Sequence, residues 1–389
     1  MEGGPKKAPE YRTWTEHPAV RAGVVIALLY IFLVGVNGLG SGFKLLSRDF
    51  VDNFFTATEN PFLALMVGIL ATTLVQSSSV TTSLIVGLVA APENPLPVAN
   101  AIPMIMGANI GTTVTNTIAS MAHIGWKEEF RRAFAVATCH DWFNYLAVLL
   151  LLPLELLTGF LSKSAHALAG LLGGLGGAEY ESPIKGAIKA GGAPIQHGIE
   201  ALAPTAGWAA TLYILVSAVL IYVALVTIVK VMRSSMHSRV ESMVTQAFEN
   251  SAIIAMAVGV LATVMVQSSS ITTSLLVPLA GAGILTLAQA FPITLGANVG
   301  TTVTALLAAL AATGEHASAG LTIALAHLIF NLSGILLIYP WERTRNLPLR
   351  AAQMLADIAT RSKLLAIGYV LILFYGIPAM FAILGHAFG

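Results

Sequence analysis

One segment occurs twice in this chain, and that repetition constrains the fold more than any other feature. Residues 66–91, MVGILATTLVQSSSVTTSLIVGLVAA, match residues 257–282, AVGVLATVMVQSSSITTSLLVPLAGA, at 17 of 26 positions without a gap. Further on, GANIGTTVT at 107–115 recurs as GANVGTTVT at 296–304. Order and spacing persist, because the offsets of these two blocks are 191 and 189 residues. We conclude that the chain consists of two related halves that arose by duplication.

Both halves are strongly apolar. Hydrophobic residues make up 56% of the 389 residues and charged residues only 10%, with a mean hydropathy of +0.80. This composition is typical of a protein that crosses a membrane many times and excludes an ordinary soluble enzyme. The apolar stretches fall at about 22–40, 61–92, 98–122, 133–160, 208–232, 252–285, 287–313, 317–341 and 364–388. Most have the roughly 20 residues that a helix needs to cross the hydrocarbon core, so we predict an all-α polytopic membrane protein.

Two of these stretches, 61–92 and 252–285, exceed the length of one simple span and are interrupted by a polar run near the middle. Each predicts a helical hairpin, or discontinuous helix, that enters the membrane and returns on the same side. One half then contributes three crossings, so its copy has the inverted topology. The count of positive charges agrees, since segments assigned to the cytoplasm hold 15 of the 20 Lys and Arg residues.

The predicted organisation follows from these stretches. It comprises a cytoplasmic N-terminal segment at 1–21, a first repeat at 22–160, an extracellular connecting loop at 161–207, a second repeat at 208–342, and a cytoplasmic loop with the final transmembrane helix at 343–389. We expect the N-terminal segment to lead into a first membrane span that is not cleaved. Cys139 is the one cysteine, which excludes an internal disulfide, and the net charge of +1 gives no sign of nucleic-acid binding.

The repeated Gln-Ser-Ser-Ser run places polar groups at membrane depth, where each must be satisfied by protein, water or a ligand. An unwound turn between two half-helices would let hydroxyls, the Gln amide and freed carbonyls converge on a cation such as sodium. The N–H groups of the following half-helix would offer donors to an anion. The alternative is that these Ser and Thr side chains bond back to helix carbonyls or join neighbouring helices.

The second repeated block, GANxGTT, offers further ligands, while its glycines permit either a helix break or a close backbone approach. The alternative role of these glycines is tight helix packing. In the following helix, His140 and His327 are repeat-related, as are Asn144 and Asn331, and for these four residues a structural role is as well supported as a functional one.

Asp141 breaks the symmetry, because its counterpart is Leu328. An ionisable residue inside a span indicates a functional site, and a carboxylate favours a cation. The alternative is that Asp141 pairs with a nearby Arg and only stabilises the fold. Arg131 and Arg132, just before the same helix, are the nearest counter-charges for an anion, and their alternative role is an ordinary cytoplasmic anchor.

These motifs resemble the type II sodium/phosphate cotransporter family. The resemblance rests on both QSSS runs, GANIGTTVTNT at 107–117, EFRRAFAVATCHDWFN at 129–144 and HLIFNLSGILLIYP at 327–340. It implies sodium-driven uptake of inorganic phosphate at the plasma membrane, with sodium as the coupling ion and no organic cofactor. It also implies that an Asp at the position of Asp141 marks electrogenic transport.

With this resemblance, the candidate ligands divide between the two substrates. The phosphate candidates are Ser77, Ser78, Ser79, Ser268, Ser269, Ser270, Asn109, Thr112 and Arg131. The sodium candidates are Gln76, Gln267, Thr81, Thr272, Asn298, Thr301, Thr302, Thr113 and Asp141.

Three other functions remain open from the residues alone. A transporter of the same fold could carry a dicarboxylate or sulfate. A simple ion channel is a second alternative. An intramembrane serine hydrolase with His140 as base is a third, but both Ser runs are intact and no Gly-x-Ser-x-Gly turn surrounds them.

Overall fold

Helices make up the fold throughout the described part of the chain, and no strand occurs there. The structure is a computed structural model that describes residues 18–44, 58–92, 95–174, 183–205, 207–224, 227, 231, 251–312 and 316–381. The helices of the N-terminal half are α1 (Pro18–Lys44), α3 (Pro61–Val75), α4 (Ser78–Val89), α5 (Val98–Thr112), α6 (Val114–Ser120), α7 (Lys127–Thr158), α8 (Phe160–Gly174) and α9 (Pro183–Leu202). The C-terminal half comprises the helix Gly207–Ala224, α11 (Ala252–Val266), α12 (Ser269–Ser274), α13 (Leu276–Gly281), α14 (Leu287–Ala311), α15 (Ala317–Ile338), α16 (Glu342–Ala359) and α17 (Lys363–Val370), which continues as a π-helical segment, Leu371–Gly376.

Five of these helices are long and apolar enough to cross a membrane. They are Lys127–Thr158, Gly207–Ala224, Leu287–Ala311, Ala317–Ile338 and Lys363–Phe381. Together with the shorter apolar helices, they confirm the predicted all-α membrane protein.

The first long stretch, residues 61–92, folds as a helical hairpin that consists of α3 and α4. Asn60 begins α3 by accepting hydrogen bonds from the N–H groups of Phe62 and Leu63. α3 packs closely against α5, because a Cβ atom on Gly107 would overlap the carbonyl oxygen of Leu65. The absence of side chains at such glycines is what allows the two backbones to touch.

The second long stretch repeats this arrangement with α11, α12 and α13. α11 packs against α14 as α3 packs against α5, and a Cβ atom on Gly296 would overlap the carbonyl oxygen of Met256. Gly296 and Gly107 hold the same position in the two GANxGTT blocks. Both predicted hairpins are therefore present.

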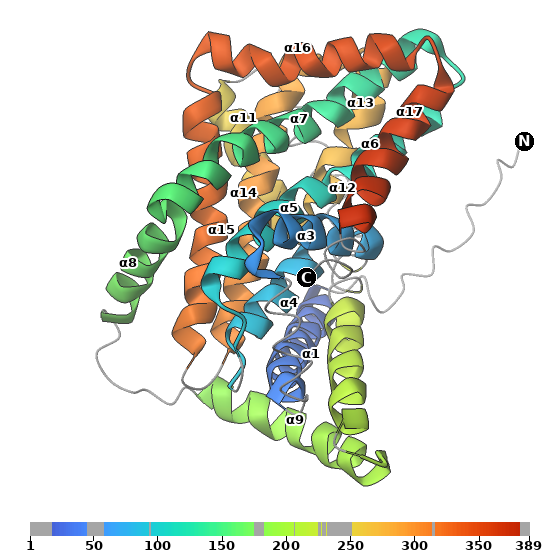
Figure 1. Cartoon of the computed structure of the whole chain (residues 1–389). Helices are drawn as coiled ribbons and strands as arrows, with labels where there is room; N and C mark the ends of the chain where they lie inside the picture. Colours follow the sequence, from blue (N-terminus) through green and yellow to red (C-terminus); the bar gives the residue numbers. More distant parts are fainter. Residues whose placement is uncertain are drawn as a thin grey trace, which may run out of the picture.

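The bases of the two hairpins lie at opposite ends of the bundle. The end of α4 meets the start of α15, where a Cβ atom on Gly320 would lie 2.9 Å from Cβ of Ala90. The end of α13 meets the start of α7, where Arg132 Nε donates to the carbonyl of Ala280 at 3.1 Å. α15 runs from the first hairpin base to α16, which packs on α7 near the second base. Figure 1 shows α16 across one end of the molecule and α9 across the other.

Two segments predicted as loops contain helices. The connecting segment 161–207 holds most of α8 and all of α9, and the segment after 342 begins with α16, which is amphipathic and buries Ala352, Ala356 and Ala359. Predictions about residues 1–17, 232–250 and 382–389 lie outside the described residues.

Candidate functional site

The first Gln-Ser-Ser-Ser run forms an unwound turn between α3 and α4, as the sequence predicts. Gln76 ends α3 in the left-handed region, at φ 56° and ψ 27°. Ser77 is extended, and its Oγ accepts a hydrogen bond from the N–H of Val80 at 3.4 Å, which caps α4. The chain thus stops one helix and starts the next within two residues.

The second run has the same geometry. Gln267 ends α11 at φ 56°, and Ser268 Oγ accepts from the N–H of Ile271 at 3.3 Å to cap α12. Among the described residues, Gln76 and Gln267 are the only non-glycine residues with a positive φ. The left-handed conformation costs an L-residue roughly 1–2 kcal/mol, so its occurrence at both matching positions indicates a functional constraint.

Each Gln side chain fixes its turn to a neighbouring helix. Gln76 Oε1 accepts a hydrogen bond from Thr115 Oγ1 at 3.0 Å, and Gln267 Oε1 accepts from Thr304 Oγ1 at 3.2 Å. Thr115 and Thr304 are the last residues of the two GANxGTTVT blocks. The carboxamide oxygens keep a lone pair that could bind a cation.

Three largely buried serines beside these turns have hydroxyls without a protein partner. Ser78, Ser79 and Ser269 are only 4%, 6% and 2% exposed, and their hydroxyls make no hydrogen bond to any described residue. Ser270 is half-buried. The N–H groups of Ser78 and Ser79 lie in the first turn of α4, where the helix itself offers no acceptor. Hydroxyl and N–H donors therefore lie together at the start of α4.

Asparagine and histidine pairs join the two halves reciprocally. His140 Nε2 donates to Asn298 Oδ1 at 2.6 Å, and His327 Nε2 donates to Asn109 Oδ1 at 3.3 Å. In each pair the histidine comes from one half and the asparagine from the other. Asn144 supports the first pair, because its Oδ1 accepts from Asn298 Nδ2 at 2.8 Å.

Asn116 on α6 ties the second hairpin to this network. Its Nδ2 donates to Thr273 Oγ1 at 2.7 Å, and its Oδ1 accepts from Ser274 Oγ at 3.0 Å. The same Nδ2 lies 3.5 Å from His140 Nδ1. The tip of the second hairpin is therefore linked through α6 to the middle of α7.

Asp141 is fully buried beside this network and has only neutral partners. Its Oδ2 accepts hydrogen bonds from Tyr369 Oη at 2.7 Å and from Thr117 Oγ1 at 3.2 Å. Its Oδ1 has no hydrogen-bond partner, and no ion pair involves Asp141 in the described part of the chain. The alternative that an Arg neutralises it is thus not what the structure shows. A buried carboxylate without a basic partner suits a cation ligand.

The threonines of the candidate set bond back to their own helices. Each hydroxyl donates to a carbonyl three or four residues earlier, as seen for Thr81, Thr112, Thr113, Thr272, Thr301 and Thr302. The glycines of the GANxGTT blocks serve close packing, and α14 passes through its block without a break. In the first block, α5 ends at Thr112, but Thr113 keeps a helical backbone. The hydroxyl oxygens still have lone pairs for a ligand.

Residues 31–176 and 211–376 match the family model described as Na+/Pi-cotransporter. The chain belongs to the Na+/Pi-cotransporter family. It is 32% identical over 442 residues to sodium-dependent phosphate transport protein 2B of Homo sapiens, covering 91% of this chain and 64% of that protein. It is 34% identical over 425 residues to sodium-dependent phosphate transport protein 2A of Rattus norvegicus, covering 92% and 66%. The chain thus spans slightly less than two thirds of these relatives, and no solved structure gives a significant match.

One predicted ligand of this Na+/Pi-cotransporter family member lies apart from the others. Arg131 is ten residues before Asp141 on α7, which corresponds to roughly 15 Å along a helix. Its side chain is 47% exposed and forms an ion pair with Asp357 of α16. The structure does not bring Arg131 to the central polar network.

Several residues of the network were not predicted from the sequence of this cotransporter family member. Thr115 and Thr304 could have been found, because both lie within the repeated block. Asn116 has Ala305 as its counterpart, and Tyr369 lies in the last helix outside the repeats. The internal repeat therefore marks neither of these two residues.

Proposed function

We propose that this protein takes up inorganic phosphate across the plasma membrane by coupling it to sodium, with inverted halves that alternate access to a central site. The observation that carries this proposal is the pair of matching left-handed Gln turns, each followed by serines at the start of a helix. The relatives named as sodium-dependent phosphate transport proteins supply the identity of the ions.

The contacts between the halves support an inverted, two-fold arrangement. The two hairpin bases lie at opposite ends of the bundle, so the hairpins enter from opposite sides. A two-fold axis between the halves that places His140 against Asn298 also places the copy of His140, His327, against Asn109. The reciprocal Asn–His pairs are therefore what such an axis would generate. Transporters with inverted repeats bind substrate near the midplane, between the halves.

In this proposal, phosphate binds where free donors gather. Ser78, Ser79 and Ser269 offer hydroxyls without a protein partner, and the first N–H groups of α4 and the positive end of its dipole favour an anion. Sodium binds oxygen ligands nearby, including the carboxamide oxygens of Gln76 and Gln267 and the free carboxylate oxygen of Asp141. Because Asp141 is present once, it gives the site an uncompensated negative charge, and we propose that transport moves net positive charge inward.

A serine hydrolase is not supported by the contacts of either histidine. His140 bonds to Asn298 and lies beside Asn116, while His327 bonds to Asn109. Neither contacts a serine of the two runs, so no serine has the adjacent base that nucleophilic catalysis needs.

The test of the proposal is phosphate uptake into proteoliposomes with and without a sodium gradient. Ser78→Ala and Ser269→Ala should each raise the phosphate concentration for half-maximal uptake about tenfold, because each removes a donor to an anion. Ser162→Ala on α8 is the matched control and should leave uptake unchanged. Uptake that is equal without sodium, or unaffected by both substitutions, would refute the proposal.

The same assay separates phosphate from the other anions. Arsenate, which shares the geometry of phosphate, should compete with labelled phosphate, and succinate should not. Competition by succinate as strong as by arsenate would instead favour a dicarboxylate transporter.

A further inference from the structure

Two arginine side chains, Arg131 and Arg132, lie at the end of the bundle crossed by α16, away from the central polar network. Here a cavity of about 260 Å³ is lined by α7, α16 and the segment between α13 and α14. A water molecule takes up roughly 30 Å³, so this volume could hold a small oxyanion together with several waters. The distribution of Lys and Arg assigns this end to the cytoplasm.

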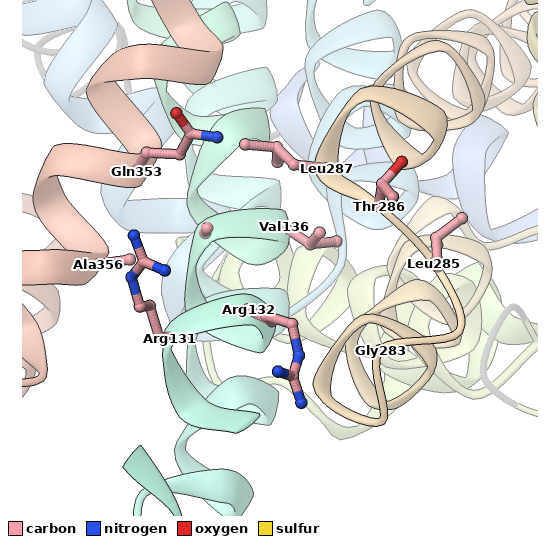
Figure 2. Close-up of a pocket in the computed structure, with 10 residues that line it drawn as sticks. Arg131, Arg132, Val136, Gly283, Leu285, Thr286, Leu287, Gln353 and Ala356 are labelled. Atoms are coloured by element: carbon pink, nitrogen blue, oxygen red, sulfur yellow. The ribbon is translucent and has the colours of Figure 1, made fainter. Parts of the chain in front are cut away.

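Two guanidinium groups from consecutive residues of α7 border the cavity. Figure 2 shows Arg131 beside Ala356 of α16 and Arg132 directed towards Gly283. Arg132 Nε and Nη2 donate to the carbonyls of Ala280 and Gly281 at 2.6 to 3.1 Å, while its Nη1 makes no hydrogen bond to a described residue. Carbonyls carry no net charge, so the positive charge of Arg132 is not neutralised.

The remaining lining favours an anion as well. None of the ten lining residues is acidic. Arg131 is paired with Asp357 and also interacts electrostatically with Glu128, whereas Arg132 forms no ion pair with any described residue. The positive charge available at the cavity is therefore that of Arg132. Figure 2 places Gln353 and Thr286 on different sides of the cavity, and the carboxamide of Gln353 can donate to an oxyanion. Thr286 caps α14, a helix of 25 residues whose first N–H groups add positive potential.

We propose that this cavity binds a phosphate-type oxyanion, either free inorganic phosphate or the phosphate of an anionic lipid headgroup, at a site separate from the transport site. The bound anion accepts hydrogen bonds from Arg131 and Gln353, which Figure 2 shows on the α16 side of the cavity, and so joins α7 to α16. Arg132, which holds the last carbonyls of α13, contributes its positive charge from the other side.

Separate binding can be tested without relying on transport. Binding of labelled inorganic phosphate to the purified full-length chain would be measured by equilibrium dialysis in choline buffer without sodium. The proposed transport site requires sodium, whereas this cavity does not, so phosphate binding should persist in choline. Sodium-dependent binding alone would support the transport proposal and overturn this one.

Two substitutions locate the binding. Arg131→Gln removes one guanidinium, and Gln353→Glu adds a negative charge while leaving both arginines in place. Each should weaken sodium-independent binding by about tenfold or more, as expected for the loss of a charge-assisted hydrogen bond or the gain of a repulsive charge. Arg350→Gln, an exposed position on α16 outside the cavity, removes the same charge and should have no effect. Equal binding by all three variants would overturn the assignment.

The source of the phosphate group is decided in nanodiscs. If phosphatidylglycerol suppresses binding of inorganic phosphate relative to phosphatidylcholine alone, and Arg350→Gln shows the same suppression, the lipid headgroup occupies the cavity. If the two lipids give equal binding, free phosphate is the ligand. Suppression that disappears in Arg350→Gln would show that the lipid acts at the general surface of α16 and would overturn the lipid arm.

Discussion

At the scale of single residues, Asp141 has the most direct consequence for function. Asp141 is a fully buried carboxylate whose Oδ2 is hydrogen-bonded to Tyr369 and Thr117, while its Oδ1 has no hydrogen-bond partner and is free to bind a cation. Asp141→Asn keeps the size of the side chain and an acceptor for Tyr369 but removes the charge. We expect phosphate uptake to continue and the associated current to disappear, because the side chain no longer carries the charge that attracts the cation. Each inward charge is worth about 2.3 kcal/mol per 100 mV of membrane potential.

The measurement is uptake and current recorded together in proteoliposomes. Tyr369→Phe serves as the control, because it removes a hydrogen bond to Asp141 and leaves the charge. Its current per phosphate should equal that of the unsubstituted protein. A current that persists in Asp141→Asn would contradict the assigned role.

Substitution of a left-handed glutamine distinguishes a role in stability from a role in transport. Gln267→Gly relieves a conformation that costs roughly 1–2 kcal/mol but removes the carboxamide that bonds Thr304. The gain and the loss are of similar size, so we expect a melting temperature close to that of the unsubstituted protein together with loss of sodium-dependent uptake. Retained uptake would show that only the turn, and not the carboxamide, is required.

Residue-level prediction from the sequence succeeded where the repeat marked the position. Gln76, Gln267 and the serines after them form the predicted turns, because both copies carry the same strained geometry. Asn116 and Tyr369 were missed, since they reach the network through contacts between helices distant in sequence, and neither lies in a repeated pattern. Arg131 was placed near the site by its closeness to Asp141 in sequence, but ten residues of helix hold the two apart.

At the scale of helices, glycine contacts decide how the hairpins pack. In an ordinary helix interior, Gly→Ala stabilises by about 1 kcal/mol. At Gly107 and Gly296 a Cβ atom would overlap a carbonyl oxygen of the facing helix, so the helices would have to separate. We expect Gly107→Ala and Gly296→Ala to destabilise the protein by about 1–3 kcal/mol.

Thermal melting of the purified variants tests this expectation. Gly368 in α17 has no atom within 4 Å of a built Cβ atom, so Gly368→Ala is the matched control and should raise the melting temperature slightly. Equal shifts at the three positions would contradict the packing role of the repeated glycines.

The sequence analysis missed helices that lack a long apolar run, because it searched for the length and hydropathy of a membrane span. The hairpins and long spans were found because their apolar runs have the length of the membrane. α16 is a surface helix with a narrow alanine face, Ala352, Ala356 and Ala359, packed on α7. Polar and charged residues interrupt the rest of this helix, so it contains no long apolar run and was predicted as a loop.

At the scale of the whole molecule, the proposed inversion makes a statement about sidedness. Pro92 and Ala282, exposed residues that follow the two hairpins, should face opposite sides of the membrane. In a background with Cys139→Ser, an impermeant thiol reagent added outside sealed right-side-out vesicles should label Pro92→Cys and not Ala282→Cys. Permeabilised vesicles provide the control, since both should then react, and labelling of both in sealed vesicles would refute the inversion.

The overall plan was accessible from the sequence because duplication, apolar length and the distribution of positive charge act over many residues. The pairing between halves was not, since His140 and His327 give no indication in sequence of which asparagine each will meet. Only the folded arrangement places each histidine against the other half.

Those reciprocal bonds also bear on how such a chain arose. A single ancestral half would have carried a buried asparagine and a buried histidine whose partners belonged to another copy. Each half therefore completes the buried hydrogen bonds of the other, and neither half would be complete alone. The two halves have diverged within this shared interior, because one holds Asp141 where the other holds Leu328.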